Sequence, residues 1–179
     1  MPSDTPWVTG FLSSIIIDYL EERHPNAARA LPYADVFTGS DLADRALHAR
    51  ELLTDPNQWL PQNALSRLIR LAEDATGETD TVYLATRAHF ERPHRRGPSI
   101  FEIIATLLDD VRGVVRASGR WATAFSTYTA LQTIEHAGRT EATILSRIDP
   151  RARPTRIPGL FLRGQFEGFP ALFGGGTRA

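Results

Sequence analysis

The sequence predicts an α+β fold, in which several helices precede an antiparallel β-hairpin and one more helix follows it. Three observations indicate this class. Apolar residues recur at helical spacing up to about residue 118. Between about residues 125 and 148 the pattern changes to the threonine-rich and β-branched composition of strands. An aromatic-rich helical segment that contains glycines then follows. Helices and strands in separate parts of a chain are typical of α+β proteins.

The first helices are marked by apolar spacing and by proline. An apolar face predicts a helix over 7–24, which ends because Pro25 forces the residue before it out of helical geometry. A short helix over 27–31 and a loop over 32–39 follow. Ser40 or Asp41 is a suitable cap for a helix that reaches Leu53.

A turn at 55–57 separates these helices from the next pair. Pro61 suits the first turn of a helix, because its missing N–H is not needed there. Gly77 predicts the end of that helix, and another is expected over 81–92. A capping box, Ser99-Ile100-Phe101-Glu102, opens a continuous apolar stripe. We expect this segment, 99–118, to be a long central helix.

The hairpin is expected from strands over 125–135 and 140–148, joined by His136-Ala137-Gly138-Arg139. A loop over 149–158 leads to the last helix, 160–173, which Pro170 should bend or end. We expect one domain over 1–179, with a flexible glycine tail at 173–179.

Composition excludes several classes of function. The 20 basic residues, all arginine, balance 21 acidic residues to a net charge of −1, which is unlike a strongly basic nucleic-acid-binding protein. The chain has no cysteine, so disulfides, thiolate metal sites and cysteine nucleophiles are excluded. No run reaches the roughly 18 apolar residues of a membrane span, and no targeting segment is visible. We expect a cytoplasmic protein.

No motif of catalysis is present. G-x-S-x-G, P-loop and GxGxxG patterns are absent, and the adjacent acidic pairs Glu21-Glu22 and Asp109-Asp110 splay apart on a helix. We therefore expect no enzymatic activity, no catalytic residues and no metal site. Arginines cluster at 92–96 and at 147–156, where solvated loops are the simplest interpretation.

Aromatic residues supply the candidates for a ligand pocket. The residues that we expect to line it are Trp59, Tyr83, His89, Phe101, Trp121, Phe125 and Phe166. Glycines at 159, 164 and 168 weaken the last helix, so close packing or the close approach of a ligand should offset them. No cofactor is expected; haem is the alternative, with His89 or His94 as its axial ligand.

The order of these elements resembles a known superfamily. Asp55-Pro56-Asn57-Gln58-Trp59, the helix that follows it, the apolar stripe over 107–115, the hairpin, and Leu162-Arg163-Gly164-Gln165-Phe166-Glu167-Gly168-Phe169-Pro170 together resemble bacterial sensor domains. These are the domains of the 4-vinyl reductase and haem nitric-oxide-binding (H-NOX-like) superfamily. The resemblance covers about 8–174. It implies an α+β fold, a small-molecule pocket between helices and sheet, and frequent dimerisation. The Tyr-x-Ser-x-Arg motif of the haem-binding branch is absent here.

Three hypotheses follow. The first is a non-enzymatic sensor domain in bacterial signal transduction that binds a small apolar or aromatic molecule. It would act as a homodimer on a separate effector protein such as a kinase, cyclase or transcription regulator, without nucleic acid. The second is a dimeric structural or interaction module without an exchangeable ligand, whose dimer surface is the apolar face of 7–20. The third is a haem-based gas sensor.

Overall fold

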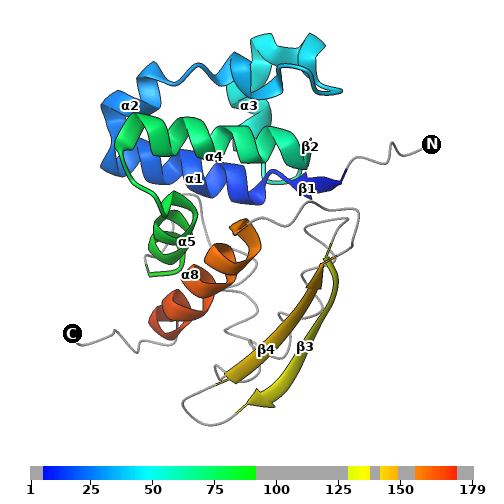
Figure 1. The fold of residues 1–179 in the computed structure, drawn as a ribbon. Coiled ribbons are helices and arrows are strands. Elements are labelled where there is room, and N and C mark those ends of the chain that lie inside the picture. The colour runs from blue at the N-terminus through cyan, green and yellow to red at the C-terminus, as the bar shows by residue number, and fades with distance from the viewer. Residues whose placement is uncertain (1–5, 92–128, 138–141, 149–155, 173–179) are drawn as a thin grey trace. The chain divides into compact units, whose positions relative to one another are not determined.

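The fold is described by a computed structural model for residues 6–91, 129–137, 142–148 and 156–172 (Figure 1). The chain divides into two compact units, Met1–Thr86 and Arg87–Ala179, and the boundary falls inside one helix. The α+β class is confirmed, because helices predominate and small antiparallel sheets accompany them. The predicted central helix over 99–118 and the tail over 173–179 lie outside the described residues. The single domain stays a prediction.

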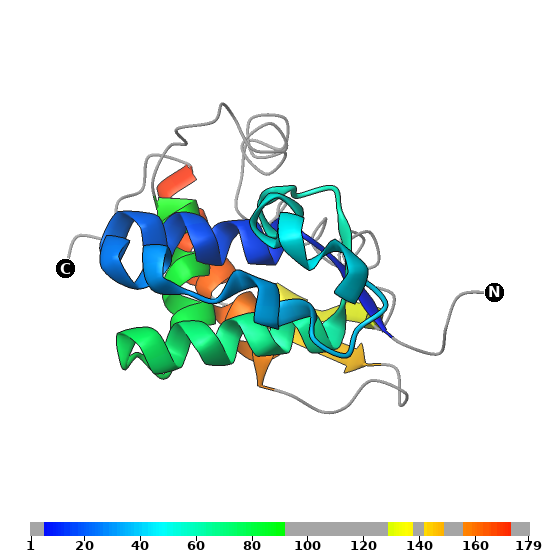
Figure 2. The ribbon, with the colours of Figure 1, turned by 90° about the horizontal axis from the view of Figure 1, so that it is seen from above.

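Helices α1 and α4 form the centre of the first unit, and they lie side by side in Figures 1 and 2. Ile16 and Leu20 of α1 and Leu65 and Leu68 of α4 are at most 2% exposed, and Phe37 is fully buried with them. The elements of this unit are β1 (Trp7–Thr9), α1 (Phe11–Arg23), α2 (Pro25–Ala30), the 3₁₀ helices η1 (Tyr33–Phe37) and η2 (Ala43–His48), α3 (Ala49–Thr54), β2 (Trp59–Pro61), α4 (Gln62–Thr76) and most of α5 (Thr81–Glu91).

Two short strands were not expected, and they correct the start of the first helix. The predicted helix over 7–24 begins only at Phe11, because Trp7–Thr9 pairs antiparallel with Trp59–Pro61. Val8 and Leu60 are opposite each other in this ladder, and both are buried. Pro61 ends β2 with extended geometry, and α4 begins one residue later at Gln62. A three-residue strand is too short to show a period, so only its distant partner identifies it.

The segment between α2 and the turn at 55–57 is more helical, and more broken, than expected. The predicted loop over 32–39 contains η1, and the predicted helix over 40–53 is instead η2 followed by α3. Ser40 lies in the turn before η2. Its hydroxyl donates to the Phe37 carbonyl at 2.8 Å and accepts from the Leu42 N–H at 3.3 Å. The N–H groups of Ala43 and Arg45 then donate to the carbonyls three residues back, which is the 3₁₀ pattern and not the α-helical one.

The predicted helix ends are confirmed where proline or glycine sets them. α1 ends at Arg23, and Pro25 then opens α2. Gly77 follows α4 in the left-handed conformation, with φ 74°, which glycine adopts without steric cost. Helix α5 covers the predicted 81–91, and Arg92 lies outside the described residues.

The second unit contains the end of α5, the hairpin β3 (Thr129–Ala137) and β4 (Ala142–Ile148), and α8 (Ile157–Leu172). The hairpin is antiparallel as predicted, but β3 runs through His136 and Ala137, which we had placed in the connection. A register irregularity after Ile134 lets the ladder continue to that point. α8 begins at Ile157, three residues early, because Pro158 is tolerated in a first turn. It ends two residues after Pro170.

Candidate functional site

Helices α5 and α8 meet in the second unit through a glycine. A Cβ added to Gly168 would lie 2.5 Å from the Cβ of Phe90 and 3.2 Å from the carbonyl oxygen of Arg87. Phe90 is fully buried, and Gly168 is buried as well. Only glycine allows the two helix backbones to approach this closely. Of the two expected explanations for Gly168, helix packing is therefore the one that the contact supports.

The other glycines of α8 differ from Gly168. Gly159 is exposed, and a Cβ there would have no atom within 4 Å. Gly164 is buried. The close approach therefore belongs to one end of α8, next to the last turn of α5.

Four charged side chains on α5 and α8 form ion pairs along and between the two helices. Arg87 Nε donates to Glu91 Oε1 at 2.5 Å along α5, and Arg163 Nε donates to Glu167 Oε1 at 2.8 Å along α8. Arg87 Nη1 and Glu167 Oε2 face each other across the helices at 3.9 Å. We call these four residues the α5–α8 charge ladder. Their side chains are 34–62% exposed, so water screens each pair.

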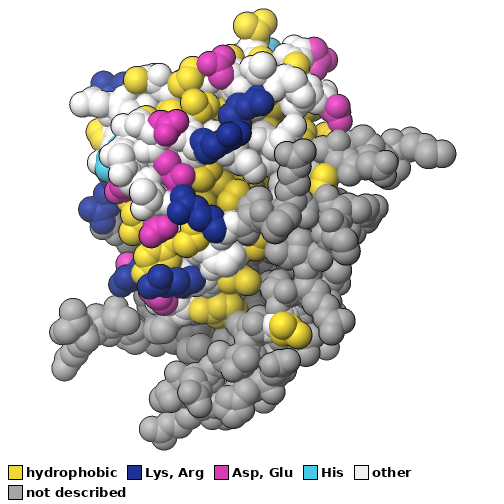
Figure 3. Space-filling model, viewed as in Figure 1, with side chains coloured by type: hydrophobic (Ala, Val, Ile, Leu, Met, Phe, Trp, Pro, Cys, Tyr) yellow, Lys and Arg dark blue, Asp and Glu magenta, His cyan; other side chains and the backbone are white. Residues whose placement is uncertain are grey.

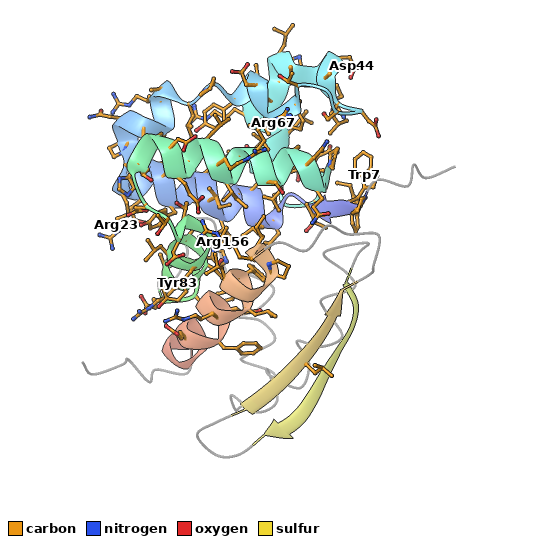
Figure 4. All side chains as sticks on the ribbon, in the orientation of Figure 1. Trp7, Arg23, Asp44, Arg67, Tyr83 and Arg156 are labelled. Atoms are coloured by element: carbon orange, nitrogen blue, oxygen red, sulfur yellow. The ribbon has the colours of Figure 1, made fainter. Side chains whose placement is uncertain are left out.

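The predicted ligand residues fall into three groups. His89 and Phe166 are half-buried on α5 and α8, each within two residues of the Phe90–Gly168 contact. The His89 ring meets the Phe90 ring edge-on, with centroids 5.1 Å apart. Tyr83 lies on α5 in the first unit (Figure 4), and Trp59 is 39% exposed on β2. The remaining candidates lie outside the described residues: Phe101, Trp121, Phe125 and His94.

Sequence reasoning missed a polar cluster in the first unit. The Tyr19 hydroxyl donates to both carboxylate oxygens of Glu78, at 3.1 Å each, and His24 Nε2 lies 3.1 Å from Oε1 of the same carboxylate. Tyr19 comes from α1, His24 from the junction of α1 and α2, and Glu78 from the residue after Gly77. The partners are 54 and 59 residues apart, so no local spacing indicates the cluster.

Electrostatics in this cluster keep the tyrosine protonated. Burial, the hydrogen bond to Glu78 and the negative charge of Glu78 together raise the pKa of Tyr19 to about 12. The charge of Arg23 opposes this shift but is the smallest contribution. A phenol with a raised pKa stays protonated and is a poor base and nucleophile near neutral pH. The hydrogen bonds of the cluster tie α1 to the residue that follows Gly77 at the end of α4.

Charge is mixed over the surface that the structure describes. On the face drawn in Figure 3, basic and acidic side chains are interspersed, with apolar patches between them. Among the described residues, no three side chains of metal-binding type gather in one place. Within the same residues, no helix combines the length and the apolar character needed to cross a membrane.

Comparisons of the chain with protein-family models, with curated proteins and with solved structures found no match. The resemblance to the sensor domains of the 4-vinyl reductase and H-NOX-like superfamily therefore rests on the sequence segments quoted above, and its implications for function are proposals.

Proposed function

We propose that this chain is a non-enzymatic sensor domain that binds a small apolar or aromatic molecule and changes the packing of α8 when it does so. The observation that carries the proposal is that two of the expected ligand residues, His89 and Phe166, are half-buried on α5 and α8, the two helices that meet at Gly168. Close-packed contacts transmit small displacements, so a change at the neighbours of this contact would be felt along α8.

The chemistry of Phe166 and His89 favours an apolar ligand. Phe166 offers a ring that is only half-buried, and half-buried apolar surface gains free energy when a ligand covers it. His89 adds a polar ring that can orient such a ligand. A ligand that prefers the docked α8 would shift the population of conformations toward it, and a dimeric partner or an effector protein would detect this shift.

A second candidate is the interaction module without an exchangeable ligand. One specific observation favours it: the packing of Gly168 against Phe90 accounts for that glycine without a ligand. In this case α5 and α8 would form a permanently packed pair, and the function would lie on an outer surface.

Native mass spectrometry of the protein purified from cells, together with its absorbance spectrum, separates these candidates. Added mass without colour supports the apolar-ligand sensor. A visible chromophore supports the haem alternative, with His89 or His94 as ligand. A bare dimer that no apolar or aromatic molecule in a thermal-shift panel stabilises would contradict the sensor and support the interaction module.

Matched variants locate the binding site. We expect Phe166→Ala to weaken binding at least about tenfold, since it removes an aromatic contact that is worth on the order of 1.5–3 kcal/mol when covered. Leu47→Ala is the control, because Leu47 is 94% exposed on η2 in the first unit. Equal loss of binding in both variants would show that Phe166 has no special role.

A further inference from the structure

The sequence of α8 makes it a poor helix on its own. Its sixteen residues include Gly159, Gly164 and Gly168, together with Pro158 and Pro170. Glycine is among the weakest helix formers, and a proline late in a helix removes a backbone hydrogen bond. Its contacts with the rest of the protein must therefore supply much of what keeps α8 helical.

The Gly168 contact holds α8 on α5 through backbone proximity. Gly168 meets Phe90 and the Arg87 carbonyl, a contact that depends on the two helices staying close. Arg87 and Glu167 form an ion pair across the two helices that is 3.9 Å long, and their side chains are 39–40% exposed. Separation of the helices would leave Arg87 with Glu91 on its own helix, 2.5 Å away. Arg87 therefore keeps an acidic partner on α5 when α8 moves away.

We propose that α8 is a conditional helix. It is helical while docked on the 87–91 end of α5, and it loses structure reversibly when that docking fails, as a step separate from unfolding of the rest of the chain. As a property of the fold this holds with or without a ligand. As the device through which binding is signalled, it rests on the proposed function. Order–disorder of one segment is a known form of molecular switch.

Hydrogen–deuterium exchange of the whole, ligand-free protein tests the proposal. We expect the amides of Ile157–Leu172 to exchange together, at least about tenfold faster than the slowest amides of α4, and with a weaker dependence on denaturant concentration than those amides, because less surface is exposed. Gly168→Ala should accelerate exchange in α8 and in 87–91 by a further tenfold or more, and leave α4 unchanged. Gly159→Ala is the matched control, because the added methyl group meets no atom within 4 Å.

A variant in the α5–α8 charge ladder tests whether charge, instead of close packing, holds α8. We expect Glu167→Gln to change α8 exchange by less than about threefold, because an exposed pair contributes little. An effect as large as that of Gly168→Ala would mean that charge, not close packing, holds the helix, and would overturn the proposal. The proposal would also be overturned if, in the unsubstituted protein, the amides of α8 exchanged only through global unfolding. This second test needs no variant. Because no ligand is present, none of these outcomes depends on whether the sensor proposal is correct.

Discussion

At the scale of single residues, the most constrained positions are those where one backbone approaches another. Gly10 has an ordinary φ of −67°, so its conformation does not require glycine. A Cβ at Gly10 would instead collide with the carbonyl oxygen of Asp55. Its N–H donates to the Gln58 carbonyl at 2.6 Å, which ties the start of α1 to the turn before β2. The importance of Gly10 therefore comes from a segment more than forty residues away.

Gly10→Ala is expected to destabilise the first unit by about 1–3 kcal/mol, the usual effect of forcing a methyl group into occupied space. Chemical denaturation followed by circular dichroism measures this free energy of unfolding. Gly159→Ala, the same substitution in open space, should change stability by less than about 1 kcal/mol and in the stabilising direction. Equal stability of the two variants would mean that the Asp55 turn moves away freely.

Tyr19 gives the molecule a predictable response to alkaline pH. Its folded-state pKa of about 12 is above the ordinary tyrosine value of about 10. Between these two pKa values the folded protein keeps the phenol proton and the unfolded chain loses it. The free energy of unfolding that this shift contributes is therefore complete below pH 10 and is lost as pH rises through 12. We expect melting temperatures to fall over this range, and to fall less steeply in Tyr19→Phe. The absorbance difference at 295 nm between the two proteins should titrate near pH 12.

Glu78→Gln is the control for the cause of that shift. It removes the charge and keeps a hydrogen-bond acceptor, so the titration of Tyr19 should move part of the way toward 10, while burial keeps it raised. A titration of Tyr19 at its ordinary value in the unsubstituted protein would contradict the cluster.

At the scale of elements, short helices are held by side chains from longer ones. Arg67 lies on α4 and is labelled in Figure 4. Its Nη1 donates to the Asp35 carbonyl at 3.2 Å and to the carbonyl of Thr38, the residue that follows η1. The Asp35 carbonyl also accepts from the Thr38 N–H at 3.2 Å, so the guanidinium is its second donor. One guanidinium thus docks η1 on α4.

Arg67→Met is expected to destabilise the first unit by about 0.5–1.5 kcal/mol, because it removes the hydrogen bonds of a charged donor to exposed carbonyl groups while it keeps the apolar stem. Arg70→Met on the same helix is the control, since Arg70 is exposed. Thermal unfolding of both variants gives the comparison. A lower melting temperature for Arg70→Met than for Arg67→Met would show that the η1 carbonyls are satisfied by water instead.

At the scale of the whole molecule, the two compact units share one continuous helix. The boundary follows Thr86, in the middle of α5. Helices form cooperatively, so melting one half of α5 removes support from the other half. We therefore expect one cooperative transition in differential scanning calorimetry, with equal calorimetric and van't Hoff enthalpies once the local opening of α8 is accounted for. Two separate transitions would contradict the predicted single domain.

Parts of the candidate site could be predicted from sequence and others could not. The glycines of the last helix indicated a close approach, and Gly168 makes one, but its partner Phe90 lies on a helix 78 positions earlier in the chain. His89 and Phe166, predicted as ligand residues for their ring chemistry, are half-buried on the two helices that make this contact. The Tyr19–His24–Glu78 cluster gave no signal, because its members come from separate elements.

Sequence patterns were sufficient to predict the ends of α1 and α4 at proline and glycine, the antiparallel hairpin and the α+β class, because these depend on local backbone geometry and on the period of apolar residues. Three features became visible only in the three-dimensional contacts: the pairing of Trp7–Thr9 with Trp59–Pro61, the docking of η1 on Arg67, and the need for glycine at Gly10 and Gly168. Each of these depends on an atom supplied by a different segment, and a one-dimensional pattern does not contain that distance.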